Sequence, residues 1–438
     1  MAGWQLAEPV ATDAEYPDVE GSSVDVNAQG QAIATWSTYD IWSERYRSRV
    51  SIKLADGWTA PMDVVTGEQA IPAQVAINDA GEALVIWEQS SPDPMQDYGR
   101  TLWARHYANG NWSSPQELTP EVPAGAHYHA YQFHLDKAGD GSFHLIWDNY
   151  SSDYSVTGVY YRRYADGVWS AQEKISESLR YVNPHRLHVM ANGDLLYLYM
   201  EEEESTGKLL VRLKKRIGGI WGEAIALDTD VPANYEDPSI TVDEGLHMSV
   251  NAGGDILVAW SAVYHDVANN RYLTSIFSKS YRAQTDTWSG LQISQPAEQQ
   301  YHYQTALNDV GRGAVAWFQE LEDSDIVEGN IRFIKYDLPN GTVSAEAEVY
   351  AADQAPFSFS NFSLLARANG DLWLLNIKAG LDLFSLNGSS AVLLGKVAGS
   401  GSVKLSCAEQ SSAVACAWGG YNLAYPPSTK FHAAVFTP

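Results

Sequence analysis

Residues 78–87 read Asn-Asp-Ala-Gly-Glu-Ala-Leu-Val-Ile-Trp, a turn that ends in glycine followed by an apolar run that ends in an aromatic residue. This pattern is typical of the first hairpin of an antiparallel sheet. The six-residue step from glycine to aromatic recurs along the 438-residue chain. The copies are Gly30–Trp36, Gly81–Trp87, Gly141–Trp147, Gly193–Tyr199, Gly254–Trp260 and Gly311–Trp317, with degraded copies at Gly370–Asn376 and Ser412–Trp418.

Each copy is followed by signals for two more strands. A polar loop leads to a third strand, such as residues 102–107, and a Gly- or Asn-rich turn leads to a fourth. We therefore expect four antiparallel strands, A to D, in every copy. The fourth strand opens with a second aromatic residue or its substitute, at Trp58, Trp112, Trp169, Trp221, Trp288 and Val343.

The copies divide the chain into eight repeats of about 55 residues, since 438 residues are shared among eight. The last repeat lacks strand D, and residues 4–10 form an orphan strand that resembles residues 112–118. Stacked four-stranded blades bury faces that one blade cannot bury alone. We predict one all-β domain, an eight-bladed β-propeller closed by the N-terminal strand. Repeats one to eight span residues 11–66, 67–119, 120–177, 178–228, 229–295, 296–350, 351–398, and 399–438 with 1–10.

The two halves of the chain resemble each other. Repeats one and five share Trp-Ser at Trp36 and Trp260, and repeats two and six share Asn-Asp-x-Gly at residues 78–81 and 308–311. This predicts a duplicated unit of four blades.

Composition limits the classes of partner. The 28 basic and 54 acidic residues give a net charge of −26, which argues against nucleic acid or an anionic membrane surface. No apolar run approaches the ~18 residues of a membrane-spanning helix, so we expect no membrane insertion. Residues 1–3 are either a native start or replace a removed leader.

The two cysteines flank one predicted hairpin. Cys407 and Cys416 lie on either side of the turn at residues 410–413, so they are directly opposed. Opposed positions on antiparallel strands are close enough for a disulfide, and the alternative is two buried thiols. A disulfide would indicate an oxidising location: the bacterial periplasm, the cell surface or the medium.

A ligand site is expected on the face that carries the longer B–C and D–A loops, at the mouth of the channel. Imidazole, phenol and guanidinium groups gather where the chain enters the innermost strand, and they suit a carbohydrate with carboxylate or sulfate groups. The alternative is that these side chains only pack against neighbouring blades. The candidate ligand-binding residues are His127, His129, Tyr131, Asn183, His185, Arg186, Tyr301, His302 and Tyr303, with Tyr39, Asp40 and Trp42 after strand B of repeat one.

Acidic B–C loops offer oxygen ligands to Ca²⁺, but no calcium-loop spacing occurs, and a solvated acidic rim is the better interpretation. We therefore predict no metal site and no cofactor. No nucleophile elbow, P-loop or dinucleotide fingerprint lies in a suitable context.

The repeat Asn-x-x-Gly-x-Ala-x-x-x-Trp, followed by an Arg/Tyr strand and a Gly-x-Trp turn, resembles secreted bacterial propellers. Among them it is similar to the eight-bladed propeller of biofilm-matrix adhesins, a resemblance that implies binding of an acidic exopolysaccharide.

Residues 183–186, Asn-Pro-His-Arg, also look like a blade opening in propeller-type ulvan lyases. That weaker resemblance implies β-elimination on a uronic-acid glycan. His129 or His185 would be the base, Tyr131 or Tyr181 the acid, and Arg186 would neutralise the carboxylate.

Three functions remain open. The first is a monomeric, secreted propeller that binds a polysaccharide, the second is a polysaccharide lyase, and the third is a protein-interaction scaffold, because a fold does not fix a function.

Overall fold

Strands and turns make up the described part of the chain. Among these residues there is no helix, and so none that is long and apolar enough to cross a membrane. The prediction of an all-β chain is confirmed. The computed structural model describes residues 8–13, 18–40, 45–65, 70–90, 100–119, 128–151, 157–176, 185–202, 209–232, 235–238, 245–297, 300–320, 329–349, 362–367, 369–377, 381–388, 391–398, 402–410, 413–422 and 428–436.

The chain divides into two compact units, which we describe separately. The first unit comprises Met1–Leu179, Ala379–Leu381 and Val397–Pro438, and the second comprises Arg180–Lys378 and Asp382–Lys396.

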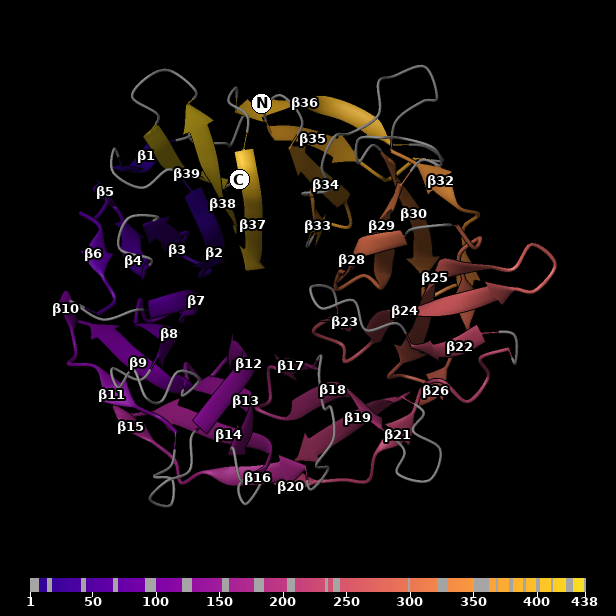
Figure 1. Cartoon of the computed structure of the whole chain (residues 1–438), viewed down its shortest axis with the longest axis horizontal. Helices are drawn as coiled ribbons and strands as arrows, with labels where there is room; N and C mark the ends of the chain where they lie inside the picture. The colour runs from indigo at the N-terminus through magenta and orange to yellow at the C-terminus, as the bar shows by residue number, and fades with distance from the viewer. Residues whose placement is uncertain are drawn as a thin grey trace. The chain divides into compact units, whose positions relative to one another are not determined.

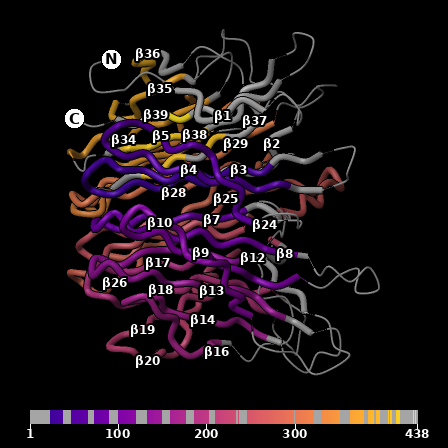
Figure 2. Tube along the Cα trace, turned by 90° about the vertical axis from the view of Figure 1, so that its left-hand side faces the viewer, coloured from indigo at the N-terminus to yellow at the C-terminus, as the bar shows by residue number. Residues whose placement is uncertain are grey.

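Antiparallel meanders in chain order build the first unit (Figures 1 and 2). Figure 2 shows the strands of repeats two and three following one another down the view, from β7 to β14. Repeat one has β2 (Asp18–Val26), β3 (Ala32–Asp40), β4 (Arg45–Leu54), β5 (Gly57–Trp58) and β6 (Met62–Asp63); repeat two has β7 (Ala70–Ile77), β8 (Ala83–Ser90), β9 (Arg100–Ala108), β10 (Asn111–Trp112) and β11 (Gln116–Glu117); repeat three has β12 (Tyr128–Lys137), β13 (Phe143–Ser151), β14 (Thr157–Ala165), β15 (Val168–Trp169) and β16 (Glu173–Ser176); repeat eight has β37 (Ser402–Gln410), β38 (Ala413–Asn422) and β39 (Ser428–Phe436), with β1 (Glu8–Asp13) beside β39.

The second unit repeats this plan in repeats four to six and most of repeat seven. Repeat four has β17 (His185–Val189), β18 (Leu195–Glu202), β19 (Leu209–Ile217), β20 (Ile220–Trp221) and β21 (Ile225–Ala226); repeat five has β22 (Tyr235–Pro238), β23 (His247–Val250), β24 (Ile256–Asp266), β25 (Arg271–Arg282), β26 (Thr287–Trp288) and β27 (Gln292–Ile293); repeat six has β28 (Gln300–Leu307), β29 (Arg312–Glu320), β30 (Gly329–Asp337), β31 (Thr342–Val343) and β32 (Ala347–Glu348); repeat seven has β33 (Phe362–Ala366), β34 (Leu372–Ile377), β35 (Leu381–Ser385) and β36 (Val392–Ala398).

Residues 78–87 form the predicted turn and strand, because the side chain of the turn asparagine bonds to the backbone of the turn. The Oδ1 of Asn78 accepts hydrogen bonds from the backbone N–H of Ala80 at 3.1 Å and of Glu82 at 3.0 Å. Gly81 has a φ of 78°, a conformation that costs a glycine little. The same positive φ occurs at the matching glycines, Gly30, Gly141, Gly193, Gly254, Gly311 and Gly370.

The aromatic residue six positions later anchors the core of each repeat. Each such side chain is at most 2% exposed and belongs to the second strand. Apolar faces of neighbouring repeats share one cluster; for example, Leu84 and Ile86 of β8 pack with Leu145 and Trp147 of β13. The repeat spacing therefore places the largest side chains where adjacent sheets meet. These aromatic residues are Trp36, Trp87, Trp147, Tyr199, Trp260 and Trp317.

Hydrogen bonds between neighbouring repeats support the predicted duplication. In the first unit the Nδ2 of Asn27 donates to the carbonyl oxygen of Asn78 at 3.0 Å. In the second unit the Nδ2 of Asn251 donates to the carbonyl oxygen of Asn308 at 3.2 Å. Repeats one and two therefore join in the same way as repeats five and six.

An N-terminal strand pairs with the last repeat. β1 runs antiparallel to β39, with Glu8 opposite Ala433 and Asp13 opposite Thr429. The register shifts between Pro9 and Ala11, and the strand ends at Asp13 rather than at the predicted residue 10. Residues 4–7 of the predicted strand lie outside the described residues.

Cys407 and Cys416 form the predicted disulfide. The two residues are directly opposed in the hairpin of β37 and β38, with their Cα atoms 4.1 Å apart. The turn follows Gln410, which pairs with Ala413, so the predicted turn position is also confirmed.

Removing this disulfide should destabilise the protein. A double variant, Cys407→Ser with Cys416→Ser, is expected to lose about 2–3 kcal/mol of unfolding free energy, because nine residues separate the cysteines and the bridge restricts the unfolded chain. Urea unfolding of the variant and of the oxidised and reduced wild type measures the loss. An unchanged midpoint in both the variant and the reduced protein would show that the bridge contributes nothing.

A buried carboxyl in repeat two should make stability depend on pH. The Glu88 residue is buried, and burial raises the pKa of its carboxyl to about 7, although Arg100 acts in the opposite direction. The folded protein therefore keeps this proton to about pH 7, whereas the unfolded chain releases it near pH 4.5. The unfolding free energy is expected to fall as the pH rises across this interval, and Glu88→Gln should remove that part of the decrease. Parallel slopes for wild type and variant in urea unfolding would contradict this.

Candidate functional site

The predicted ligand-binding residues fall into three groups. His127, Asn183, Trp42 and the lyase candidate Tyr181 lie outside the described residues. Others are placed as strand residues: Tyr39 and Asp40 in β3, His129 and Tyr131 in β12, and His185 in β17. The remaining four, Arg186, Tyr301, His302 and Tyr303, have described side chains and belong to the second unit.

The second unit brings Arg186 and Tyr303 together with His247. Arg186 lies on β17 of repeat four, His247 on β23 of repeat five and Tyr303 on β28 of repeat six. β23 contacts both of the other strands (Figure 1). The rings of His247 and Tyr303 meet edge to face, with their centroids 5.3 Å apart. We call Arg186, His247 and Tyr303 the inner-strand cluster.

Burial and a nearby phenol set the electrostatics of this cluster. Burial lowers the pKa of the Arg186 guanidinium from its ordinary value, and an electrostatic interaction with Tyr303 opposes the change. Tyr303 is 1% exposed, so its side chain packs in the core and does not contact solvent. A guanidinium stays charged even when its pKa falls, and away from bulk water it binds an anion more strongly.

A β-bulge gives Tyr303 its position. The pairing of β28 with β29 shifts between Tyr301 and Gln304, so two residues of β28 lie opposite the single residue Trp317 of β29. One of them, His302, has a φ of 50° and an exposed side chain, while the next, Tyr303, turns into the core. Bulges redirect side chains in this way and occur often beside functional sites. Tyr301 flanks the bulge and donates its hydroxyl to the Oε2 of Glu320 at 3.2 Å.

The repeats that correspond to these three by the predicted duplication, which are repeats eight, one and two, carry small residues at the same positions. Arg186 pairs with the residue before the aromatic Tyr199, and Ser406 pairs with the residue before Trp418. By the same register His247 corresponds to Ser23.

Tyr303 corresponds to Ala73, because each residue precedes a glutamine with the same role. The side chain of Gln304 accepts a hydrogen bond from the backbone of Leu364 in the next repeat, and the side chain of Gln74 accepts one from the backbone of Leu135. Serine and alanine therefore satisfy the fold at these positions. The second unit has a cation, an imidazole and a phenol at these positions instead.

His247 is the residue of this cluster that is not among the ligand-binding residues predicted from the sequence. The repeat pattern does relate His247 to Arg186. Each of them pairs with the residue that precedes the aromatic residue of its own repeat. His265, of the same repeat as His247, belongs to β24 and pairs with Tyr272.

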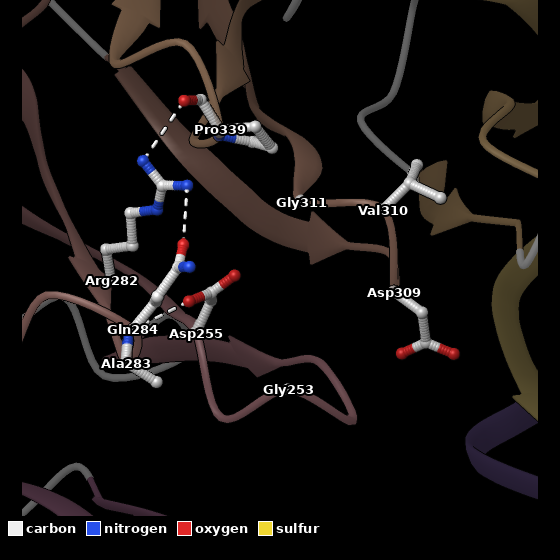
Figure 3. Close-up of a pocket in the computed structure, with 9 residues that line it drawn as sticks. All are labelled: Gly253, Asp255, Arg282, Ala283, Gln284, Asp309, Val310, Gly311 and Pro339. Atoms are coloured by element: carbon white, nitrogen blue, oxygen red, sulfur yellow. Dashed lines mark hydrogen bonds between the residues drawn. The ribbon is translucent and has the colours of Figure 1, made fainter.

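A shallow depression of about 380 Å³ lies among the short turns of repeats five and six (Figure 3). Its polar groups bond mostly to each other. Arg282 donates from Nη1 to the carbonyl oxygen of Pro339 and from Nη2 to the Oε1 of Gln284, both at 3.0 Å. Asp255 accepts the backbone N–H of Ala283 at 2.9 Å. These groups hold the turns together, so we place no ligand there.

Within the described ranges, no three His, Cys, Asp or Glu side chains gather closely enough to hold a metal ion. The chemistry available at the inner-strand cluster is therefore that of one guanidinium, one imidazole and one phenol.

Comparison with known proteins identifies the fold. No protein-family model matches the chain, and no curated protein matches it. An ulvan lyase, described as a polysaccharide lyase and bound to a saccharide of GlcA and sulfated Rha, is 8% identical with a TM-score of 0.50, and the match covers 98% of this chain and 94% of the lyase.

The WD40 domain of SCAP from fission yeast is 9% identical with a TM-score of 0.50, and the match covers 99% of this chain and 98% of that domain. WD40 repeats form β-propellers. Together with the antiparallel meanders described above, these similarities show that the chain has a β-propeller fold.

Proposed function

We propose that this chain is an eight-bladed β-propeller, closed by the N-terminal strand, that binds an acidic polysaccharide through Arg186. Arg186 and His247 belong to strands that contact each other, the ring of Tyr303 meets that of His247, and the side chain of His302 is exposed. The observation that carries the proposal is the inner-strand cluster itself, since the corresponding positions in repeats one, two and eight are Ser23, Ala73 and Ser406.

The chemistry of the cluster fits an anionic sugar. A guanidinium forms two parallel hydrogen bonds with a carboxylate or sulfate, and these charge-assisted bonds are stronger than neutral ones. A histidine beside it adds a donor, and an exposed imidazole such as that of His302 can contact a sugar ring. The net charge of −26 would repel a polyanion at a distance. The partly buried guanidinium of Arg186 is the group that would attract the acidic glycan at short range.

The similar structures give limited support, because they show the fold alone. One of them is an ulvan lyase bound to an acidic saccharide, and the other, equally similar, is a WD40 domain. The side chains of the cluster, and not the likeness, favour a glycan over a protein partner. The disulfide is consistent with a secreted or cell-surface protein, and we propose that it acts as a monomer outside the cytoplasm.

A lyase is the second candidate, and the same three residue types favour it. β-Elimination needs a cation to neutralise the uronate carboxylate, a base to take the proton next to it, and an acid to protonate the leaving oxygen. Arg186 would be the cation and His247 or His185 the base, and the leaving oxygen would take its proton from water, because Tyr303 is buried. In that reaction the bond to the leaving oxygen breaks as a carbon–carbon double bond forms.

One experiment separates these functions. The purified chain is applied to carboxylated, sulfated and neutral polysaccharides in affinity electrophoresis, and the ultraviolet absorbance of each mixture is followed for an unsaturated uronate product. We expect retention by acidic polysaccharides, weakened by salt, and no rise in absorbance. A rise that His247→Ala abolishes would make the protein a lyase. No retention by any polysaccharide would overturn the proposal and favour a protein-binding scaffold.

A further inference from the structure

A second polar site lies in the first unit, between repeats two and three. Glu88 on β8 and Arg100 on β9 form an ion pair, with 3.3 Å between the carboxylate Oε2 and the guanidinium Nη1. The guanidinium side chain is 40% exposed, whereas the carboxyl side chain is 11% exposed. The pair therefore runs from the surface into the interface between two sheets.

An amide faces the pair from the neighbouring repeat. Ile86 and Trp147 belong to one apolar cluster between repeats two and three. Side chains alternate along a strand, so Glu88, two residues after Ile86, and Asn149, two residues after Trp147, face the same interface. Asn149 is 3% exposed, and among the described residues neither its Oδ1 nor its Nδ2 has a hydrogen-bond partner.

The two repeats meet at this end of their strands. His129 of β12 pairs with Arg100 of β9, and this parallel pair joins the two meanders into one ten-stranded sheet (Figure 1). Ala130, the next residue, pairs with Asn149. Arg100 and Asn149 therefore lie on the two strands that flank β12, at the same end of the interface between the repeats.

The fold does not require charges at this position. In the duplicated repeat six, the residues that correspond to Glu88 and Arg100 are Phe318 and Gly329, by their register with the aromatic residue. Phe318 is 0% exposed, and a Cβ at Gly329 would lie 2.3 Å from its ring. One half of the chain thus fills this place with an apolar ring, and a buried ion pair adds little stability over such packing.

An unsatisfied buried amide is costly, commonly about 1–3 kcal/mol, so its presence needs a reason. The raised pKa of the nearby carboxyl means that it exists in both protonation states near neutral pH and can donate or accept a hydrogen bond. An amide also does both. A hydroxyl group is the ligand that both donates and accepts, whereas a carboxylate would be repelled by ionised Glu88.

We propose that Glu88, Arg100 and Asn149 form a second binding site, which takes adjacent hydroxyl groups of a neutral sugar. This site is separate from the inner-strand cluster and does not depend on it.

The test uses neutral methyl glycosides as probes and saturation-transfer NMR on the full chain. We expect transfer to at least one glycoside, and affinity lowered at least about 10-fold by Asn149→Ala and by Glu88→Ala, as for the loss of one strong hydrogen bond. Glu82→Gln is the matched control, because Glu82 lies in the same repeat but bonds to Asn78 at the turn. It should bind as the wild type does.

Two further readouts decide between explanations. If the amide of Asn149 binds a ligand, Asn149→Ala should not lower the unfolding free energy. If a buried water satisfies the amide, the variant should lose stability and bind the glycoside as the wild type does. That second result would overturn the proposal. Glu88→Gln provides the comparison should Glu88→Ala fail to fold. Arg186→Ala should keep glycoside binding, so a failure of the proposed acidic site is distinguishable. Absence of transfer to every glycoside would also contradict the second site.

Discussion

Arg186→Ala should lower the affinity for an acidic polysaccharide by about 10- to 100-fold, the equivalent of a lost hydrogen-bonded charge contact of about 1.5–3 kcal/mol. Arg186 is the cation of the inner-strand cluster, and burial strengthens its attraction to an anion. Titration calorimetry with the polysaccharide that the wild type binds measures the effect. The unfolding free energy should change little, because serine occupies the corresponding position in repeat eight.

Arg282→Ala is the matched control, since it removes the same charge from the same unit. The Arg282 guanidinium bonds to Pro339 and Gln284 among the short turns, outside the inner-strand cluster. This variant should bind the polysaccharide normally. Arg186→Lys should recover only part of the affinity, because an ammonium cannot form the paired hydrogen bonds of a guanidinium. Equal losses for the two alanine variants would mean that net charge, and not this site, controls binding.

Trp260→Ala should lower the unfolding free energy by about 3–5 kcal/mol, the largest stability effect that we expect of a single substitution. The side chain is 0% exposed and stacks on Phe277 with the ring centroids 5.9 Å apart. It packs between repeats four and five, so its removal leaves a cavity that rigid sheets cannot close. Urea unfolding followed by circular dichroism measures the loss.

Trp288→Ala serves as the comparison for size and residue type. Trp288 is partly exposed at the end of β26 and tilts against Tyr281, with ring centroids 5.3 Å apart. Its replacement should cost less than half as much, because part of its surface already contacts water. Equal losses at the two positions would contradict the account of the core, in which the aromatic residue six positions after the turn glycine is the anchor.

The sequence predicted most of the strand plan, because the signals for it are local. A glycine that must adopt a positive φ, an asparagine that bonds to its own turn and a fixed step to an aromatic residue are all visible in Asn78–Trp87 without knowledge of distant contacts. The disulfide also followed from local register, since only the hairpin turn at Gln410 had to be placed.

The site was predicted only in part, for reasons that lie in register and burial. Arg186 and Tyr303 were found because they enter an innermost strand. The meeting of His247 with Tyr303 depends on a bulge in β28, and the face that each strand presents after a bulge is not encoded in spacing. The shift between Pro9 and Ala11 moved the end of β1 for the same reason.

Glu88 and Asn149 were missed because each looks ordinary in its own strand. Their relation becomes visible only when two sheets are packed and the partners of the amide are counted. The comparison of Glu88 and Arg100 with Phe318 and Gly329 required the registers of both repeats. Side-chain contacts between repeats could therefore not be predicted from the sequence.

The central claim is that the inner-strand cluster of the second unit holds the anionic group of a sugar. A crystal structure of the protein with an acidic oligosaccharide tests it most directly. We expect a carboxylate or sulfate within hydrogen-bond distance of the Arg186 guanidinium, with the sugar beside His247. An oligosaccharide seated instead in the depression around Arg282, with nothing bound at Arg186, would contradict the claim.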